Sequence, residues 1–240
     1  MKPTIVLVNG AWANNDAWAG EIYRLQRLGY TVIAPPNPLQ SLSGDSETIA
    51  DLLSTISGPI VLVGHSYGGM VITNAAYGNL NVKALVYVDA FAPAQGESAL
   101  GLDGEFPGSG LNAGPPSTIF NFVPFPGAAS GDSLVYVKPS VFEQVFANGL
   151  HAPERAELAA TQDPATFSAL TAASGPPAWK TIPSWYVLGE TDKAITPAAQ
   201  LFMAQRIHAH ITDVPGGHLS MIEDPDAVTN VIIRAASTTS

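Results

Sequence analysis

Cysteine is missing from this sequence of 240 residues, and charged side chains are scarce. Without cysteine the chain can form no disulfide, use no thiolate nucleophile and bind no metal through sulfur. Charged residues make up 12% of the chain, with 10 Lys and Arg against 20 Asp and Glu and a formal net charge of −10. Nucleic acids and anionic membrane surfaces are bound through clusters of basic residues, and no basic run occurs here. We therefore expect neither as a partner.

Long hydrophobic runs are missing as well. No apolar stretch approaches the roughly 18 residues that span a bilayer, and the strand-like run TIVLVN (4–9) starts without the pattern of a signal peptide. We expect a cytoplasmic protein, and an oligomer is compatible with the sequence. Hydrophobic residues nevertheless make up 46% of the chain, enough for the large core of one α/β domain with an insertion.

Short apolar runs alternate with amphipathic segments along most of the chain. The runs lack polar alternation, which is typical of parallel strands buried on both faces. They are TIVLVN (4–9), TVIAP (31–35), PIVLVG (59–64), KALVYVDA (83–90), SWYVLGE (184–190) and HITDVPG (210–216). Helices are expected over 16–28, 45–56, 67–78, 197–207 and 224–236. This alternation predicts an α/β fold with a mostly parallel central sheet flanked by helices.

One interval, from about residue 93 to 183, breaks this alternation, because no strand–helix pair is evident in it. Its first part, 106–130, has many Pro and Gly residues and no charged residue, and helix-like stretches follow at 138–150 and 153–162. A structureless segment of this length is uncommon in a compact domain. We expect residues 93–183 to form a cap, inserted before the penultimate strand of a core made of 1–92 and 184–240.

The stretch GHSYGG (64–69) contains the pattern G-x-S-x-G around Ser66, between PIVLV and MVITNAAY. This pattern predicts a sharp strand-to-helix turn that exposes the serine hydroxyl as a nucleophile, because bulky neighbours would clash with the adjoining strand and helix. The Tyr67 N–H then lies at a helix N-terminus, where it can face an oxyanion. A second donor is expected after the first strand, where Gly10 permits close approach of the Ala11 N–H.

A serine hydroxyl needs a base, and His218 is favoured among the five histidines. It follows the last strand-like run on a Gly-Gly loop, which brings it to the carboxyl ends of the strands. Asp192 follows the run SWYVLGE, gives the order Ser, acid, His and can orient the imidazole. Asp89, at the end of KALVYVDA, is the competing acid and otherwise a pocket residue. The pair His208 and His210 has no third ligand of matching spacing, so no metal is expected.

Together these motifs resemble the α/β-hydrolase-fold enzymes, and in particular compact bacterial esterase-like proteins related to plant methylesterases and hydroxynitrile lyases. The resemblance covers nearly the whole chain through VNGAW, GHSYGG, AFAP, PAWKTIPSWYVLGETDKAI and GGHLSM. It implies Ser66 as nucleophile, His218 as base and Asp192 as acid. It further implies Ala11 and Tyr67 as oxyanion donors, and it implies no cofactor.

Two positions differ from parts of that family. Relatives usually carry His-Gly where this chain has Asn9-Gly10, and that histidine supports the oxyanion loop, where Asn can also hydrogen-bond to the backbone. Hydroxynitrile lyases tend to have threonine at the position of Gly10 and lysine directly after the catalytic histidine, where this chain has Leu219. These differences favour hydrolysis over cyanohydrin cleavage.

We therefore expect a serine hydrolase that cleaves a carboxylic ester, or a lactone or thioester, through an acyl-enzyme. The uncharged cap favours a small-to-medium apolar substrate, although its phenylalanines are equally compatible with a small core of the cap itself. The expected pocket residues are Trp12, Asp89, Phe120, Phe122, Phe125 and Leu219. Two alternatives stay open: a hydroxynitrile-lyase-like or other non-hydrolytic enzyme with the same residues, and a ligand-binding protein with residual hydrolysis.

Overall fold

The structure is a computed structural model, and it describes residues 2–239. Six strands form one parallel sheet in the order β2-β1-β3-β4-β8-β9. These strands are β1 (Thr4–Val8), β2 (Val32–Ile33), β3 (Ile60–His65), β4 (Val82–Val88), β8 (Ser184–Gly189) and β9 (His210–Val214). Each strand-like run of the sequence contributes one strand, so the predicted parallel sheet is confirmed.

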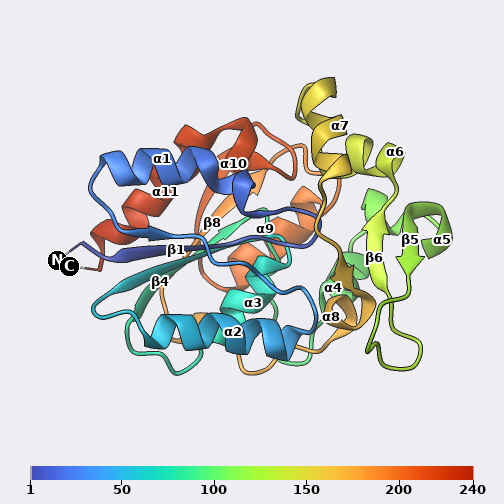
Figure 1. The fold of residues 1–240 in the computed structure, drawn as a ribbon. Coiled ribbons are helices and arrows are strands. Elements are labelled where there is room, and N and C mark those ends of the chain that lie inside the picture. The colour runs from blue at the N-terminus through green and yellow to red at the C-terminus, as the bar shows by residue number, and fades with distance from the viewer. Residues whose placement is uncertain (1, 240) are drawn as a thin grey trace.

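Helices cover both faces of this sheet (Figure 1). On one face α1 (Ala19–Arg27) packs against α11 (Pro225–Ser237), and on the other α2 (Leu42–Ser54) packs against α3 (Gly68–Ala75). Next to them, α9 (Pro197–Arg206) packs against β8. The shorter helices of the core are η1 (Asn15–Trp18) and α10 (Ser220–Glu223). All five expected helices are present, with ends that differ from the prediction by a few residues.

The central strands are buried along their whole length. All six residues of β3 and all six of β8 are buried, because helices cover both faces of a parallel sheet. This explains why the runs show no polar alternation. Among residues 2–239, every helix is too short or too polar to cross a lipid bilayer.

Most of the 93–183 interval lies beyond the carboxyl ends of the strands, at the right of Figure 1, whereas its last part, with η4 (Ala178–Lys180), packs against α3 of the core. It contains a second sheet, which is antiparallel and has the order β5-β6-β7. Its elements are α4 (Ala99–Glu105), η2 (Gly110–Asn112), α5 (Pro116–Ile119), β5 (Phe120–Val123), β6 (Leu134–Val137), α6 (Pro139–Val141), η3 (Phe142–Phe146), α7 (Ala152–Ala160), β7 (Ala165–Thr166), α8 (Phe167–Thr171) and η4 (Ala178–Lys180). The sequence analysis identified no strand here, because these strands are short and their partners are distant in sequence.

The loop after β1 joins the core to this interval through Trp12. The backbone N–H of Trp12 donates to the Asp163 carbonyl at 2.7 Å, and its indole Nε1–H donates to the Val135 carbonyl of β6 at 2.7 Å. The indole ring also stacks on Phe120, with ring centroids 5.7 Å apart. One residue of the core thus makes three contacts with the interval that covers it.

Candidate active site

Ser66 lies in a tight turn between β3 and α3. Its backbone has φ = 53°, a left-handed conformation that is strained for a residue with a side chain. A Cβ on Gly64 would lie 2.6 Å from the Gly68 carbonyl oxygen, and a Cβ on Gly68 would lie 2.5 Å from that of Val8. A Cβ on Gly69 would collide with the Phe91 carbonyl. The glycines therefore allow the turn to hold Ser66 at the sheet edge.

The structure brings Ser66, His218 and Asp192 into one hydrogen-bonded chain. Ser66 Oγ lies 3.0 Å from His218 Nε2, and His218 Nδ1 lies 2.7 Å from Asp192 Oδ2. All three side chains are buried, and burial lowers the pKa of His218. A neutral imidazole that donates from Nδ1 to a carboxylate has a free lone pair on Nε2, and this lone pair can accept the serine proton.

Asp192 is surrounded by hydrogen-bond donors. Burial raises the pKa of its carboxyl, and hydrogen bonds from Ala194, Ile195 and Gln200 act in the opposite direction. Oδ1 accepts from the backbone N–H groups of Ala194 at 2.7 Å and Ile195 at 3.0 Å, and Oδ2 accepts from Gln200 Nε2 at 2.7 Å. With His218 Nδ1, four N–H groups face the two oxygens. A proton on this carboxyl would find no acceptor among them, so the ionised form fits the site.

Asp89 does not contact His218. Its Oδ1 accepts from the Gly189 N–H at 2.8 Å, and its Oδ2 accepts from the Ser220 N–H at 3.0 Å. Asp89 is fully buried, and its backbone has φ = 45°. The carboxylate therefore joins the end of β8 to the segment after His218, and it supports the loops that carry the other two groups.

His65, directly before the nucleophile position, also supports His218. Its Nε2 lies 2.8 Å from the His218 carbonyl oxygen. Because a carbonyl only accepts, this nitrogen carries the hydrogen. Burial lowers the pKa of His65 well below its usual value, so the ring is neutral. Its hydrogen bond fixes the backbone of the residue that carries the imidazole.

Two backbone N–H groups lie beside the Ser66 hydroxyl. Neither the Ala11 N–H nor the Tyr67 N–H donates to another group within residues 2–239. A Cβ on Gly10 would lie 2.7 Å from Ser66 Cβ and 3.1 Å from the Tyr67 nitrogen, so the two loops approach closely. The Tyr67 side chain points elsewhere, since its hydroxyl donates to Asp45 Oδ2 at 2.8 Å. This geometry can form an oxyanion hole.

Asn9 holds the loop that carries Ala11. Its side-chain nitrogen donates to the Ala13 carbonyl at 2.8 Å and to the Gly10 carbonyl at 3.1 Å, and its own carbonyl accepts from Asn37 at 2.9 Å. The buried amide thus makes the backbone hydrogen bonds that the sequence analysis expected of an asparagine at this position. Asn9 stabilises the loop from within.

A small cavity opens onto Ser66 and His218. Most of its lining is apolar: Ala11, Trp12, Tyr67, Phe91, Ala99, Leu100, Leu111, Leu170 and Ile195, together with Ser66, Asp103 and His218. A second cavity shares Leu100, Leu111 and Leu170 with the first and extends to Phe120 and Phe167. The two form an apolar slot between the core and the 93–183 interval.

The expected pocket residues divide between the slot and other places. Trp12 lines the cavity at Ser66, and Phe120 lines the second cavity. Four residues line neither: Asp89, Phe122, Phe125 and Leu219. Asp89 and Leu219 are buried against the core, whereas 41% of the Phe122 surface is exposed on β5. For Phe122 and Phe125, an apolar residue type in the 93–183 interval does not reveal which face the side chain occupies. Asp89 lies outside this interval, and its oxygens accept from backbone N–H groups of the core.

A family comparison now identifies the fold. A model of the alpha/beta hydrolase family matches residues 5–231. The chain belongs to this family. As a family member it has the expected α/β-hydrolase fold, which its six-stranded parallel sheet also displays.

This alpha/beta hydrolase is similar in sequence to fungal and bacterial proteins, and it shares its fold with solved structures that include a plant protein. The alpha/beta hydrolase nvfD of Aspergillus novofumigatus is 28% identical, over 98% of this chain and 97% of the relative. The carbendazim hydrolyzing esterase of a Nocardioides species is 37% identical over 40% of this chain and 46% of its own length. Among solved structures, polyneuridine aldehyde esterase has a TM-score of 0.79 at 18% identity, covering 98% of this chain and 99% of that chain. A methylesterase from Arabidopsis has a TM-score of 0.78 at 16% identity, covering 98% and 99%.

Two residues at the site of this hydrolase were not found from sequence. Gln200 on α9 donates to both Asp192 Oδ2 and the Ile195 carbonyl, but a glutamine on an amphipathic helix carries no signal of its own. Asp103 on α4 lines the cavity at Ser66. A signal for Asp103 existed, because it is one of very few acidic residues in the apolar first half of the 93–183 interval. No group of three or more His, Asp or Glu residues with the geometry of a metal site occurs in the part of the chain described here.

Proposed function

We propose that this alpha/beta hydrolase cleaves carboxylic esters of small-to-medium apolar substrates through an acyl-enzyme on Ser66. One observation carries the proposal: the hydrogen-bonded chain Ser66–His218–Asp192 ends at an apolar cavity beside two free backbone N–H groups. The esterase names of several relatives support the same class of reaction. Lactones and thioesters share the reacting carbonyl and belong to the same proposal.

In the first half of the reaction, His218 Nε2 takes the proton of Ser66 Oγ as this oxygen attacks the ester carbonyl carbon. The electron pair of the C=O bond moves to oxygen, and the Ala11 and Tyr67 N–H groups stabilise the resulting oxyanion. Asp192 holds the imidazolium by its Nδ1–H. When the intermediate collapses, the C–O bond to the alcohol breaks, and Nε2 returns its proton to the leaving oxygen.

In the second half, water attacks the acyl carbon and gives its proton to His218 Nε2. Collapse of this second oxyanion breaks the bond to Ser66 Oγ, which recovers the proton as the carboxylic acid leaves. No other reactant is needed. Leu219, which follows His218, is apolar and buried, so no cation stands at that position to stabilise a departing cyanide, and this favours hydrolysis over the lyase alternative.

The test combines active-site labelling with turnover. A fluorophosphonate should label the chain once, at Ser66, and Ser66→Ala should lose both the label and p-nitrophenyl butyrate hydrolysis, with kcat at least about 10⁴-fold lower. Ser46→Ala is the matched control, since Ser46 is also buried but lies on α2. It should keep both properties.

Different outcomes separate the alternatives. Labelling of another residue, or turnover that survives in Ser66→Ala, would refute the nucleophile assignment. Cleavage of mandelonitrile without ester hydrolysis would favour the lyase, and binding of esters with less than one turnover would favour a ligand-binding protein. Within a series of p-nitrophenyl esters, we expect kcat/KM to peak at short or medium acyl chains because the cavity at Ser66 is small and its lining is mostly apolar.

A further inference from the structure

Asp103 is the only carboxyl group in the lining of the Ser66 cavity among the described residues. It lies on α4, within the interval that covers the sheet, and 4% of its surface is exposed. It takes no part in the Ser66–His218–Asp192 chain. Burying an acid in an otherwise apolar cavity costs free energy unless the acid is neutral or paired. The protonation state of Asp103, and the oxygen that has no partner, therefore determine which ligand groups it can bind.

Ser109 reveals the protonation state of Asp103. Its Oγ lies 2.8 Å from Asp103 Oδ2 and 2.7 Å from the Ala194 carbonyl oxygen, and it accepts from the Leu111 N–H at 3.2 Å. A hydroxyl has one hydrogen, and a carbonyl only accepts. Ser109 therefore donates to Ala194, and the hydrogen between Ser109 Oγ and Oδ2 belongs to Asp103.

When the Ser109 hydroxyl donates to the Ala194 carbonyl and accepts from Asp103 and the Leu111 N–H, its one hydrogen and both lone pairs are used. If Asp103 were ionised, Ser109 would donate to it and leave its own oxygen 2.7 Å from a carbonyl oxygen with no hydrogen between them. The surroundings also favour the neutral acid. Burial raises the pKa of Asp103 to about 7, Ser109 acts against this, and the nearby Asp192 raises it further.

The second oxygen, Oδ1, is left for a ligand. It forms no hydrogen bond within residues 2–239, and it belongs to a residue that lines the cavity. In an acid whose hydrogen is on Oδ2, Oδ1 is a carbonyl oxygen and accepts hydrogen bonds. A substrate in this cavity therefore has Ser66 and His218 as its reacting partners and Asp103 Oδ1 as a separate, neutral hydrogen-bond acceptor.

We propose that Asp103 is a specificity-determining residue whose Oδ1 accepts a hydrogen bond from a hydroxyl or N–H group of the substrate. This inference rests on the proposed function and narrows its substrate class: a small ester with an apolar body and one hydrogen-bond donor in its acyl or alcohol part. Such a site rejects the analogue that lacks the donor, because Oδ1 then stays buried without a partner.

The test measures preference within matched pairs of esters. The acyl series is p-nitrophenyl butyrate, 2-hydroxybutyrate and 3-hydroxybutyrate, and the alcohol pair is propyl butyrate and 2-hydroxyethyl butyrate. We expect at least one hydroxy ester to exceed its deoxy partner by about 3- to 10-fold in kcat/KM. Asp103→Asn should keep this preference, because its amide can donate to Ser109 and leave Oδ1 in place. Asp103→Leu should abolish it.

Glu105→Gln is the control, since Glu105 is an exposed carboxyl residue on the same helix and lies outside the lining of the cavity. It should leave the preference unchanged. The inference is overturned if the wild type shows no preference in any pair, or if Asp103→Leu retains the preference. It is also overturned if Asp103→Asn loses as much as Asp103→Leu, because the ionised acid would then be the recognising form.

Binding separates this inference from the proposed function. In the Ser66→Ala background, calorimetric titration with 2-hydroxyethyl butyrate and propyl butyrate measures recognition without turnover, and the same Asp103 variants should shift the affinity ratio. A binding preference without wild-type hydrolysis would refute the function and keep the inference.

At about pH 5.5, the infrared difference between wild type and Asp103→Asn should contain the C=O band of a protonated carboxyl. A carboxylate band in its place would overturn the neutral acid.

Discussion

At the scale of single residues, strain and hydrogen bonding concentrate at the same place. Ser66, Asp89 and Trp12 all have positive φ although none is glycine. Each sits directly after a parallel strand or in the loop that follows one, at the edge where the cavity opens. Non-glycine residues in this conformation persist only where their surroundings hold them. Here Asp89 accepts hydrogen bonds from the backbone N–H groups of Gly189 and Ser220, and the Trp12 indole donates to the Val135 carbonyl.

The two candidate acids, Asp192 and Asp89, should respond differently to the same substitution. Asp192→Asn replaces an oxygen that faces N–H donors by an amide group, so His218 loses the acceptor of its Nδ1–H and can adopt the wrong tautomer. We expect kcat for p-nitrophenyl butyrate to fall by about 10³- to 10⁴-fold with little change in KM. Asp89→Asn instead weakens a bond between loops, which should destabilise the fold by about 1–3 kcal/mol and lower kcat less than about tenfold.

Steady-state kinetics and thermal unfolding of both variants measure this difference. A larger loss of kcat in Asp89→Asn than in Asp192→Asn would contradict the assignment of the acid. The sequence alone could not decide between the two, since both follow buried strands and both fit the spacing of this fold. The decision depends on the orientation of the His218 ring. His65 and Asp192 hydrogen-bond to His218, and Asp89 accepts from the nearby Ser220 N–H, all across distant parts of the chain.

At the scale of elements, what could be predicted from sequence depends on how local the signal is. The strands of the central sheet were recognisable because helices cover both of its faces, so that each strand is a continuous apolar run. The Ser66 turn was recognisable because its glycines are required by contacts within a few residues. The β5-β6-β7 sheet was not, because β7 has two residues and pairs across the interval with β6.

Trp12 provides a test of how the interval is held over the site. Trp12→Phe keeps an aromatic ring against Phe120 but removes the indole donor to the Val135 carbonyl. We expect a loss of about 1–2 kcal/mol in the free energy of unfolding. Because Trp12 also lines the cavity, we further expect a rise of about 3- to 10-fold in KM for p-nitrophenyl butyrate. Thermal unfolding and steady-state kinetics measure the two effects.

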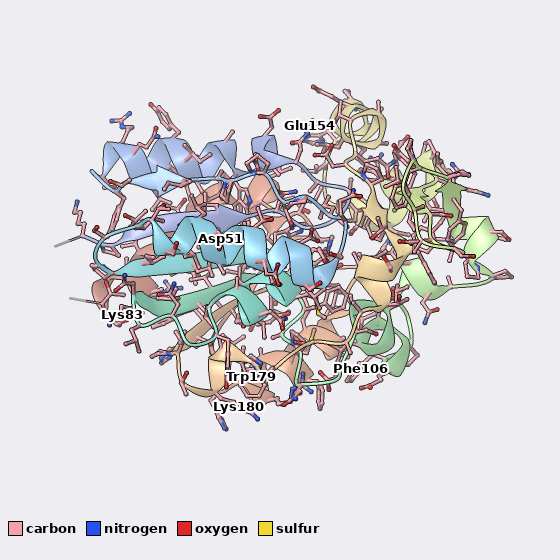
Figure 2. All side chains as sticks on the ribbon, turned by 60° about the horizontal axis from the view of Figure 1, so that its bottom comes forward. Asp51, Lys83, Phe106, Glu154, Trp179 and Lys180 are labelled. Atoms are coloured by element: carbon pink, nitrogen blue, oxygen red, sulfur yellow. The ribbon has the colours of Figure 1, made fainter. Side chains whose placement is uncertain are left out.

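Trp179→Phe is the matched control. The Trp179 indole donates to the Pro93 carbonyl at 2.8 Å, but Trp179 lines neither part of the slot. Figure 2 shows it beside Lys180, away from the β5-β6 sheet. This variant should lose a similar amount of stability and keep the wild-type KM. An equal rise of KM in both variants would mean that Trp12 acts through general destabilisation and not through its place in the cavity.

At the scale of the whole molecule, acidic residues outnumber basic ones by 20 to 10, and several of the acidic side chains are buried. Burial raises the pKa of several carboxyl groups outside the Ser66–His218–Asp192 chain, among them Glu21, Asp45, Asp89, Asp103 and Glu223. A group whose folded-state pKa lies above its unfolded value contributes stability that is fully present below the unfolded pKa. This contribution is lost as pH rises through the folded pKa. We therefore expect the fold as a whole to lose stability toward alkaline pH.

Glu21 on α1 makes this expectation specific. Its side chain is fully buried, neither carboxylate oxygen has a hydrogen-bond partner within residues 2–239, and burial raises its pKa to about 9. The folded protein must therefore hold a proton on Glu21 at neutral pH, while the unfolded chain releases it above about pH 4.5. Glu21→Gln removes this linkage. The variant should gain stability over the wild type by at most about 1.4 kcal/mol for each pH unit between these values.

The difference in melting temperature between Glu21→Gln and the wild type, measured at pH 5, 6, 7 and 8, tests this directly, with about 2–4 °C expected per kcal/mol. The exposed Glu47→Gln on α2 is the control, and its difference should stay flat over the same range. The other buried acids titrate in the same way in the variant and in the wild type. The difference in melting temperature therefore reports the titration of Glu21 alone. A Glu21→Gln difference that is flat, or that shrinks as pH rises, would mean that Glu21 is ionised in the folded state and that α1 holds a buried charge.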